Sequence, residues 1–399
     1  MEDFGPFALL ISRSLPVNRL PFAPLLLFVL LGLAAKPALA QSAGDAPTVT
    51  TADDDTRLSF GVIFQPRMSY GLSDPSASSG EATVERYGFG LRRARFRMRA
   101  AVGRAGAFMQ LDGAGGTVKL LDYSASYRPG KRVRVRLGRF AVAQPRAMLL
   151  TSGAQIDAID RAAIAERWAR NTIGSDGRDF GFDVRYALER GELSVALHNG
   201  DGNPDRLRGN FREQPSGGDA TRGVETQGLA VTASAVFRPM ASNALEVGGF
   251  AGLNGSRNPN TRAVGSDRGR TYVTYGAHVY WGARPGSRPF RLKLDALGIL
   301  YEAPSRFENR QNTLGVAILG AARLHRAAEL FARFEQYDPD TNRAGSGDTY
   351  LTAGGSLSLS ALRGKPYHRE RLTLGYSLFS PDGSNAREHL VILQAQLVF

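Results

Sequence analysis

The sequence predicts an all-β fold: a transmembrane, antiparallel up-and-down β-barrel of about 16 strands with a long constriction loop. Three observations predict it. From residue 57 onward, runs of about ten residues with alternating apolar character are separated by turn residues. The connections between these runs alternate between short and long. The last run, from His389 to Phe399, is apolar at every odd position from Val391 and ends in a C-terminal Phe, which is typical of the closing strand of an outer-membrane barrel.

The N-terminus has the pattern of a cleavable export signal. Arg13 and Arg19 precede an apolar run over residues 21–35, and Ala38-Leu39-Ala40 follows as a small-residue cleavage site. This run is too short for a spanning helix, although an uncleaved N-terminal anchor is the alternative. The chain is then divided into a signal peptide at 1–40, a short periplasmic N-terminal segment at 41–56 and an outer-membrane β-barrel at 57–399.

The amino-acid composition limits the kinds of binding site and partner that the protein can have. The 399 residues include no Cys, which excludes a disulfide framework and a thiolate metal site. The formal net charge of +13 favours anionic partners. Only five of the 50 basic residues are Lys, and the rest are Arg. A genome rich in G and C would produce this bias, but a guanidinium also binds oxyanions bidentately, so position must decide between the two causes.

The strands are runs in which apolar residues share one parity. In the first run, Leu58, Phe60, Val62 and Phe64 alternate with small or polar residues. The same alternation recurs over residues 180–188, 229–237 and 372–378. Short connections are expected at 128–131, 189–191, 238–239, 284–286 and 363–366, and longer polar loops at 71–85, 200–225, 254–269, 302–312, 338–348 and 380–388. Short periplasmic turns alternating with long extracellular loops indicate an up-and-down barrel with both termini in the periplasm.

One connection, residues 141–178, is far longer than the others. Long loops in compact folds are usually functional, so we expect this one to fold into the lumen and narrow it. Its middle, residues 156–170, mixes Ala with acidic and basic side chains, which predicts a short helical turn. A loop that stays on the surface is the alternative.

Arginines occupy one parity of two predicted strands. In the second strand, Arg93, Arg95, Arg97 and Arg99 alternate with apolar or small residues. The fifth strand repeats the pattern with Arg132, Arg134 and Arg136. An Arg at the lipid midplane costs about 2–4 kcal/mol, so both rows are expected to face the lumen and make the pore wall cationic. Further inward candidates, which either contact solute or form a wall network with Asp183, Asp295 and Glu335, are Arg185, Arg291, Lys293, Arg333, Arg369 and Arg371.

This organisation resembles the phosphate-selective porin O and P family of Gram-negative outer membranes. The matching segments are Leu91-Arg92-Arg93-Ala94-Arg95, Leu137-Gly138-Arg139-Phe140, Ile159-Asp160-Arg161, Arg178-Asp179-Phe180-Gly181, Phe331-Ala332-Arg333-Phe334-Glu335 and the terminal Gln394-Ala395-Gln396-Leu397-Val398-Phe399. The resemblance implies a sixteen-stranded barrel, usually a homotrimer, narrowed by its third extracellular loop, with lumen arginines that guide anions. It implies that role for Arg93, Arg95 and Arg161. The acidic residues of the long loop and the scarcity of Lys depart from the pattern and bear on phosphate preference.

Motifs of other function classes are missing from the sequence. It contains no G-x-S-x-G, Walker A or H-E-x-x-H motif, and its five His residues lie on separate segments. Asp201-Gly202-Asn203-Pro204-Asp205 is a poor calcium loop because no Glu follows at the required spacing. We therefore expect no catalytic residues, no metal site and no cofactor. The export signal and the barrel pattern also exclude nucleic acid as the partner of the basic charge.

The favoured hypothesis is an outer-membrane porin with a water-filled, anion-preferring channel for passive diffusion of small solutes, phosphate or other oxyanions among them. The expected partners of the protein are outer-membrane lipid and two further copies of the same chain, which together form a homotrimer. The alternatives are an outer-membrane barrel enzyme of the lipase or protease type and a plugged structural or adhesive barrel.

The export signal makes a testable prediction. If cleavage follows Ala40, the protein recovered from outer membranes begins at Gln41, and its formal charge is then +12 because residues 1–40 carry one net positive charge. N-terminal sequencing checks this prediction. A protein that still begins at Met1 would contradict it.

Overall fold

The computed structural model describes residues 48–50, 56–74, 83–173, 176–200, 229–240, 242–255, 271–302, 311–382 and 386–399. Residues Asp45–Phe399 form one compact unit. The predicted signal peptide at 1–40, the candidate calcium loop at 201–205 and most of the predicted long loops lie outside the described residues. The unit Asp45–Phe399 contains all the strands described below.

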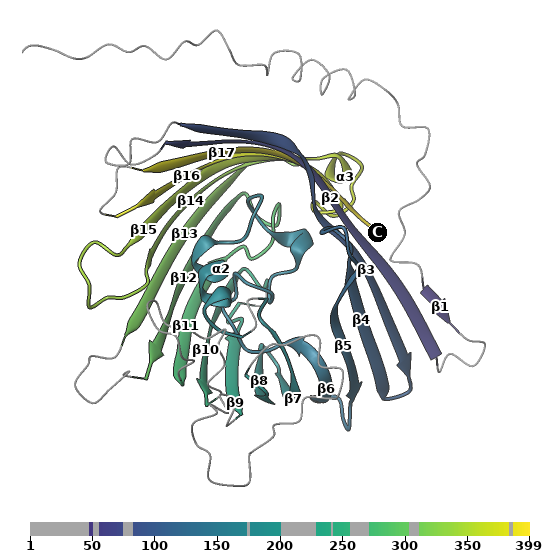
Figure 1. The fold of residues 1–399 in the computed structure, drawn as a ribbon. Helices are drawn as coiled ribbons and strands as arrows, with labels where there is room; N and C mark the ends of the chain where they lie inside the picture. The colour runs from purple at the N-terminus through teal and green to yellow at the C-terminus, as the bar shows by residue number, and fades with distance from the viewer. Residues whose placement is uncertain are drawn as a thin grey trace, which may run out of the picture. The chain divides into compact units, whose positions relative to one another are not determined.

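Sixteen antiparallel strands form a closed ring (Figure 1). They are β2 (Thr56–Asp74), β3 (Val84–Val102), β4 (Ala105–Asp112), β5 (Lys119–Tyr127), β6 (Val133–Ala141), β7 (Arg178–Leu188), β8 (Gly191–His198), β9 (Ala230–Phe237), β10 (Leu245–Asn254), β11 (Tyr272–Trp281), β12 (Phe290–Tyr301), β13 (Asn312–His325), β14 (Ala328–Asp338), β15 (Asp348–Ser358), β16 (Glu370–Pro381) and β17 (Arg387–Val398). Each strand pairs with its sequence neighbours, and β17 closes the ring against β2. The predicted all-β barrel of about 16 strands is confirmed.

Short and long connections lie at opposite ends of this ring. Two-residue turns at 103–104, 189–190 and 326–327 mark one rim, which we call the turn end, and the opposite rim is the loop end. The connection between β15 and β16 also lies at the turn end and contains a short helix, α3 (Leu359–Leu362), which the sequence did not predict. A further short strand, β1 (Thr48–Thr50), lies within the predicted N-terminal segment and pairs with β2 near the turn end.

The wall has an apolar outer face and a polar inner face. On β8, Leu193, Val195 and Leu197 are 43–54% exposed, whereas Ser194 and His198 are at most 8% exposed. Because successive side chains of a strand point to opposite faces, this alternation separates the two faces of the wall. Beside an apolar cluster around α2, the buried set of the described residues contains many Arg, Lys, Asp, Glu and Gln side chains, which an ordinary water-soluble core rarely buries.

The long connection lies inside the ring. Residues 142–177 contain a 3₁₀ turn, η2 (Gly153–Gln155), and a helix, α2 (Ala163–Arg170). Figure 1 shows α2 within the ring, where it packs against β12, β13 and β14. Trp168 of α2 is fully buried and meets the Phe250 ring edge-on, with 5.6 Å between ring centroids. This apolar contact holds one face of the helix to the wall.

No helix among the described residues is long and apolar enough to cross a membrane.

Ring closure predicts the effect of losing the last residue. The backbone N–H of Phe399 donates to Val62 O, and Phe399 O accepts from Val62 N, both at 3.1 Å. Deleting Phe399 removes both hydrogen bonds where β17 meets β2, so less closed barrel should form. Heat-modifiable migration of refolded protein measures this yield. Phe399→Tyr keeps the backbone pair and should fold normally, and an unchanged yield after deletion would refute the proposed importance of this pair.

Candidate functional site: the arginine-lined interior

The long loop is attached to the wall on two sides. On the first side, the Asp157 carboxylate lies between two basic side chains of β12: its Oδ2 is 2.6 Å from Lys293 Nζ, and its Oδ1 bonds Arg291. Arg291 also pairs with Glu329 of β14. Arg371 of β16 donates to Ile156 O at 2.8 Å. Three of the predicted inward basic residues therefore hold the loop, which is the wall-network role that the sequence left open.

On the second side, the loop reaches β2, β3 and β17. Asp160 accepts from Arg92 and from Arg67, whose Nη1 lies 3.3 Å from Oδ2, and Glu166 lies 3.1 Å from Arg92. Gln65 of β2 donates to Gly153 O at 3.1 Å. The loop therefore spans the interior from β12–β16 to β2–β3 instead of lying along one wall.

Wall side chains also satisfy both ends of α2. Glu335 accepts from the first-turn N–H of Ile164 at 3.1 Å, which places a carboxylate at the positive end of the helix dipole. At the other end, Arg167 pairs with Asp348 at 2.9 Å, and Asn171 donates to the Tyr337 hydroxyl at 3.0 Å. These contacts stabilise α2 and hold it in one position against the wall.

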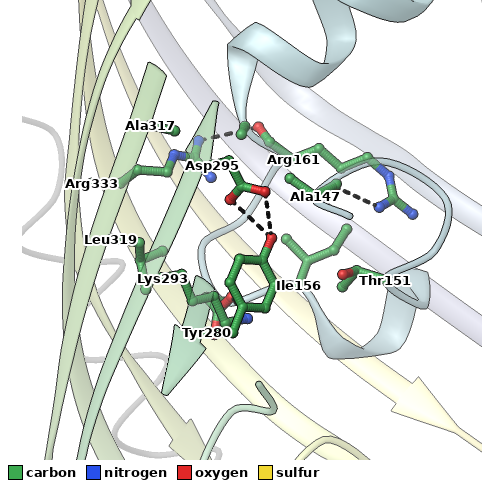
Figure 2. A pocket seen from close by; sticks show the side chains of 12 residues that line it. Ala147, Thr151, Ile156, Arg161, Tyr280, Lys293, Asp295, Ala317, Leu319 and Arg333 are labelled. Carbon is green, nitrogen blue, oxygen red and sulfur yellow. Dashed lines mark hydrogen bonds and ion pairs between the residues drawn. The ribbon is translucent and has the colours of Figure 1, made fainter. Parts of the chain in front are cut away.

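Little space separates the loop from the part of the wall formed by β11–β14. Figure 2 shows the cavity between them, where the Tyr280 hydroxyl donates to the Asp295 carboxylate and Arg333 reaches the backbone of Arg161. The cavity volume is about 40 Å³, which is room for a few water molecules but not for a hydrated solute. The loop therefore leaves no room for a hydrated solute against this part of the wall.

The arginine row of β3 lies on the inner face of the wall, and its four members differ in surroundings. Arg93 is 2% exposed, lies beneath the loop and donates to Gln65 Oε1 at 2.7 Å. Arg95 pairs with Asp112 at 2.7 Å, and Arg97 donates to the neutral Gln110 at 2.7 Å. Arg99 lies over the ring of Phe108, 5.0 Å from its centroid. Only Arg95 of these four pairs with a carboxylate of the described residues.

The second predicted row is less regular. Arg136 binds Asp183 through two nitrogens, with Nε 3.0 Å from Oδ1, and its guanidinium lies 3.8 Å from the Phe140 ring centroid. Arg134 is on the same inner face, opposite Arg185 in the register with β7. Arg132 was predicted to belong to this strand, but β6 begins at Val133, so Arg132 is an exposed residue of the preceding turn.

Arg161 is one of the basic residues of the loop itself. Its side chain runs away from the Asp295–Tyr280 pair toward Ala147, to whose carbonyl oxygen Nη1 donates at 3.1 Å (Figure 2). The Met148 carbonyl oxygen also accepts from Nη1, and Arg161 is only 6% exposed. Burial lowers the pKa of Arg161 well below its ordinary value, and Arg93 and Arg95 act in the same direction. The field at this point is positive and incompletely balanced.

We call the part of the interior where the loop meets β3 and the start of β7 the neck, and two of its arginines were not predicted. Arg178, at the start of β7, is buried and pairs with Asp122 of β5 at 2.9 Å. Arg92 falls on the parity expected to face outward, yet it reaches Asp160 and Glu166. The register explains this, because Gln65 pairs with Arg93 but Pro66 pairs with Leu91, which leaves Arg92 in a bulge. Pro66 was the available signal, since Pro inside a strand marks an edge or a bulge.

Basic groups outnumber acidic groups around the neck. The guanidiniums are those of Arg67, Arg92, Arg93, Arg95, Arg97, Arg139, Arg161 and Arg178, and the carboxylates are those of Asp112, Asp122, Asp160, Glu166 and Asp176. Such an excess lowers the electrostatic barrier to an anion and raises it for a cation.

One acid–histidine pair lies elsewhere in the barrel. His198 Nδ1 is 2.7 Å from Asp179 Oδ2, and both side chains are fully buried. The same Asp179 oxygen accepts from Gly200 N, so the pair fixes the backbone where β8 ends. A substrate has no access to this pair, and its geometry is that of a structural contact. No group of three or more His, Cys, Asp or Glu in the described part of the chain could hold a metal ion.

Solved structures with the same fold are porins and related outer-membrane proteins. The anion-selective porin from Comamonas acidovorans has 13% sequence identity and a TM-score of 0.61, with 86% of this chain and 100% of that chain covered. The OmpT loop-deletion mutant, an outer-membrane protein of Vibrio cholerae, has 10% identity and a TM-score of 0.57 (87% and 100% covered). Salmonella typhi OmpF in complex with daunomycin has 10% identity and a TM-score of 0.56 (88% and 100% covered).

At these identities the likeness concerns the fold alone. No protein-family model matches the chain, and no curated protein matches its sequence. The resemblance to the phosphate-selective porin O and P family therefore remains a prediction from the quoted segments.

The Asp157 contact predicts how the loop is held. Replacing Asp157 by Asn leaves Lys293 and Arg291 without this carboxylate, and breaking a buried pair in this way costs about 3–5 kcal/mol. Amide hydrogen exchange within 142–177 should become faster, while β12 stays protected. Asp74→Asn, at the exposed loop end of β2, is the matched control, and equal protection of the loop in both variants would show that Asp157 does not hold it.

The same contact predicts a pH dependence. Burial alone would raise the pKa of Asp157, but Lys293 and Arg291 outweigh burial and lower the pKa from 3.8 to about 2. The stabilisation is therefore present above pH 3.8 and lost as the pH falls toward 2. Loop exchange in the native protein should be constant from pH 7 to about pH 4 after correction for intrinsic rates, and the difference from Asp157→Asn should vanish only below that range.

Proposed function

We propose that the protein is an outer-membrane porin of a Gram-negative bacterium, exported by a signal peptide and forming a water-filled channel that prefers small anions. The closed ring with an apolar outer face supports a place in a membrane, because every wall strand pairs on both sides and none leaves an open sheet edge toward lipid. The shared fold of the porin structures supports the same placement.

The observation that carries the anion preference is the arginine wall beside the loop. Arg97 and Arg99 extend along β3 with no carboxylate of the described residues in salt-bridge contact, and Arg161 adds a guanidinium from the loop. An anion that leaves bulk water loses hydration, and guanidinium N–H groups replace part of it. In this proposal passage is passive, because solutes diffuse through the channel down their concentration gradients.

The long loop sets the size limit in this proposal. Its contacts with β12–β16 close one side of the lumen, and those with β2 and β3 narrow the other. Because its acidic groups are bound to wall arginines, the loop narrows the path without making it anionic. The family resemblance adds phosphate as a candidate solute and a homotrimer as the assembly.

A plugged structural barrel is the second candidate. The observation in its favour is that Arg161 is only 6% exposed and that the loop contacts both sides of the interior. Conductance in a planar bilayer distinguishes the two candidates, since a plugged barrel passes no current.

The channel proposal predicts a selectivity change. Replacing Arg97 and Arg99 by Glu reverses two wall charges that make no described carboxylate contact, so the barrel should still fold. Under a gradient of potassium chloride, the zero-current potential should move from anion-selective toward cation-selective. The effect should grow as salt is lowered, because the Debye length is about 10 Å at 0.1 M and about 30 Å at 0.01 M.

Arg326→Glu with Lys365→Glu is the matched control, because both residues are exposed at the turn end, away from β3. At 0.1 M salt this control should keep the native selectivity. A folded Arg97→Glu, Arg99→Glu variant with native selectivity would place the row outside the ion path and remove the main support for anion preference.

A further inference from the structure

A recess opens in the inner wall at the turn end, between β3 and β6. Its volume is about 360 Å³, which lies within the range of pockets that hold small metabolites. The arginines that line it are Arg99, Arg104, Arg128, Arg134 and Arg136, and none of its lining residues is a carboxylate.

Small residues create the recess. The register places Ala101, Gly106, Ser126 and Arg136 in one row across β3, β4, β5 and β6. Three of these four positions carry at most a hydroxymethyl group, so the wall is hollow between the flanking guanidiniums. A Cβ atom added at Gly106 would lie 3.1 Å from Ser126 Oγ, which shows how closely β4 and β5 approach at the floor.

The positive charge of the recess is largely uncompensated. Arg136 pairs with Asp183, but Arg99 stacks on Phe108 and Arg104 donates to Pro129 O at 3.1 Å. Within the described part of the chain, no carboxylate forms a salt bridge with Arg99, Arg104, Arg128 or Arg134. Several like charges held together are stabilised when an anion enters between them.

A second cavity at the turn end also contains several arginines but differs in its acidic lining. This cavity, of about 620 Å³, is also lined by five arginines, Arg284 and Arg288 among them, but it includes Glu189 and Glu246. Glu246 pairs there with Arg146 at 2.6 Å and with Arg238 at 2.7 Å. Its charge is therefore partly neutralised by the protein, whereas the recess leaves that role to a ligand.

We propose that the recess binds a small organic anion with two or more oxyanion groups, of the class of a tricarboxylate or a phosphorylated sugar. A single monovalent anion would leave most of the guanidiniums without a partner and most of the volume unfilled. A polyvalent anion can bind arginine guanidinium groups of β3 and β6 at the same time, with Ser124 and Ser126 as hydroxyl donors. The inference rests on the proposed function, because it names the solute class that the channel would retain near its periplasmic mouth.

The test measures binding directly, so that it does not depend on conduction. Citrate is titrated into the detergent-solubilised barrel at low salt by isothermal calorimetry, with acetate and inorganic phosphate as smaller probes. We expect one saturable citrate site and weaker binding of both smaller anions. Arg99→Gln with Arg134→Gln should weaken citrate binding by at least about tenfold, because the variant removes two charge-assisted donors to the anion.

Two further variants separate a built recess from general surface charge. Ala101→Phe keeps every arginine but fills the hollow, and it should abolish the citrate site. Arg284→Gln with Arg326→Gln removes the same charge from the same end outside the recess and should leave citrate affinity unchanged.

Equal weakening in that control, or phosphate binding as tight as citrate binding, would overturn the proposal, as would the absence of a saturable site. Conductance of the native barrel in potassium chloride is measured separately. A conducting, anion-selective barrel without a citrate site overturns only this inference, whereas a barrel that passes no current overturns the proposed function.

Discussion

The constraint on which the rest of this structure depends is the pairing of backbone polar groups around a closed ring. A wall that faces hydrocarbon has no water to satisfy N–H and C=O groups, so each strand must pair on both sides. Closure through β17 and β2 meets this requirement and fixes which face of every strand is outside. Charged side chains are then confined to the interior, where they must be hydrated or paired. This constraint explains why the long loop contains carboxylates, because a segment that enters such an interior must pair with the wall arginines.

Asp157 and Asp160 meet that need on opposite sides of the barrel, and their positions give the interior its asymmetry. Where the loop meets β12, charge is balanced within the protein and little space remains. Where it faces β3, Arg161 bonds only backbone carbonyls among the described residues, and the adjacent wall is rich in guanidiniums. In the proposed channel, packing and electrostatics therefore both favour a solute route on the β3 side of the loop.

Strand parity predicted the fold and the inward faces, because alternation with period two reflects the two environments of a barrel wall. It also placed Arg95, Arg97, Arg99, Arg134 and Arg136 on the inner face. It could not show what covers that face, and Arg93 and Arg161 are buried by contacts that join segments far apart in sequence. Arg92 was missed because a bulge beside Pro66 shifts the parity, and Arg132 was misplaced because the turn extends one residue further.

Partners along the β3 row change in a direction that matters for the proposed channel. Arg95 has a carboxylate, Arg97 an amide and Arg99 an aromatic ring, so compensation by the protein falls toward the turn end. In the proposed channel, an anion moving from Arg95 toward Arg99 passes from one guanidinium paired with a carboxylate to two that have no such partner among the described residues. Since conduction requires sites that attract an ion and also release it, the carboxylates among the neck arginines weaken the hold on an anion where the loop narrows the proposed channel, while the excess of positive charge still admits the anion. In the proposal, a polyvalent anion is then retained at the recess, where it can contact several guanidiniums. A small monovalent anion contacts only a few of them.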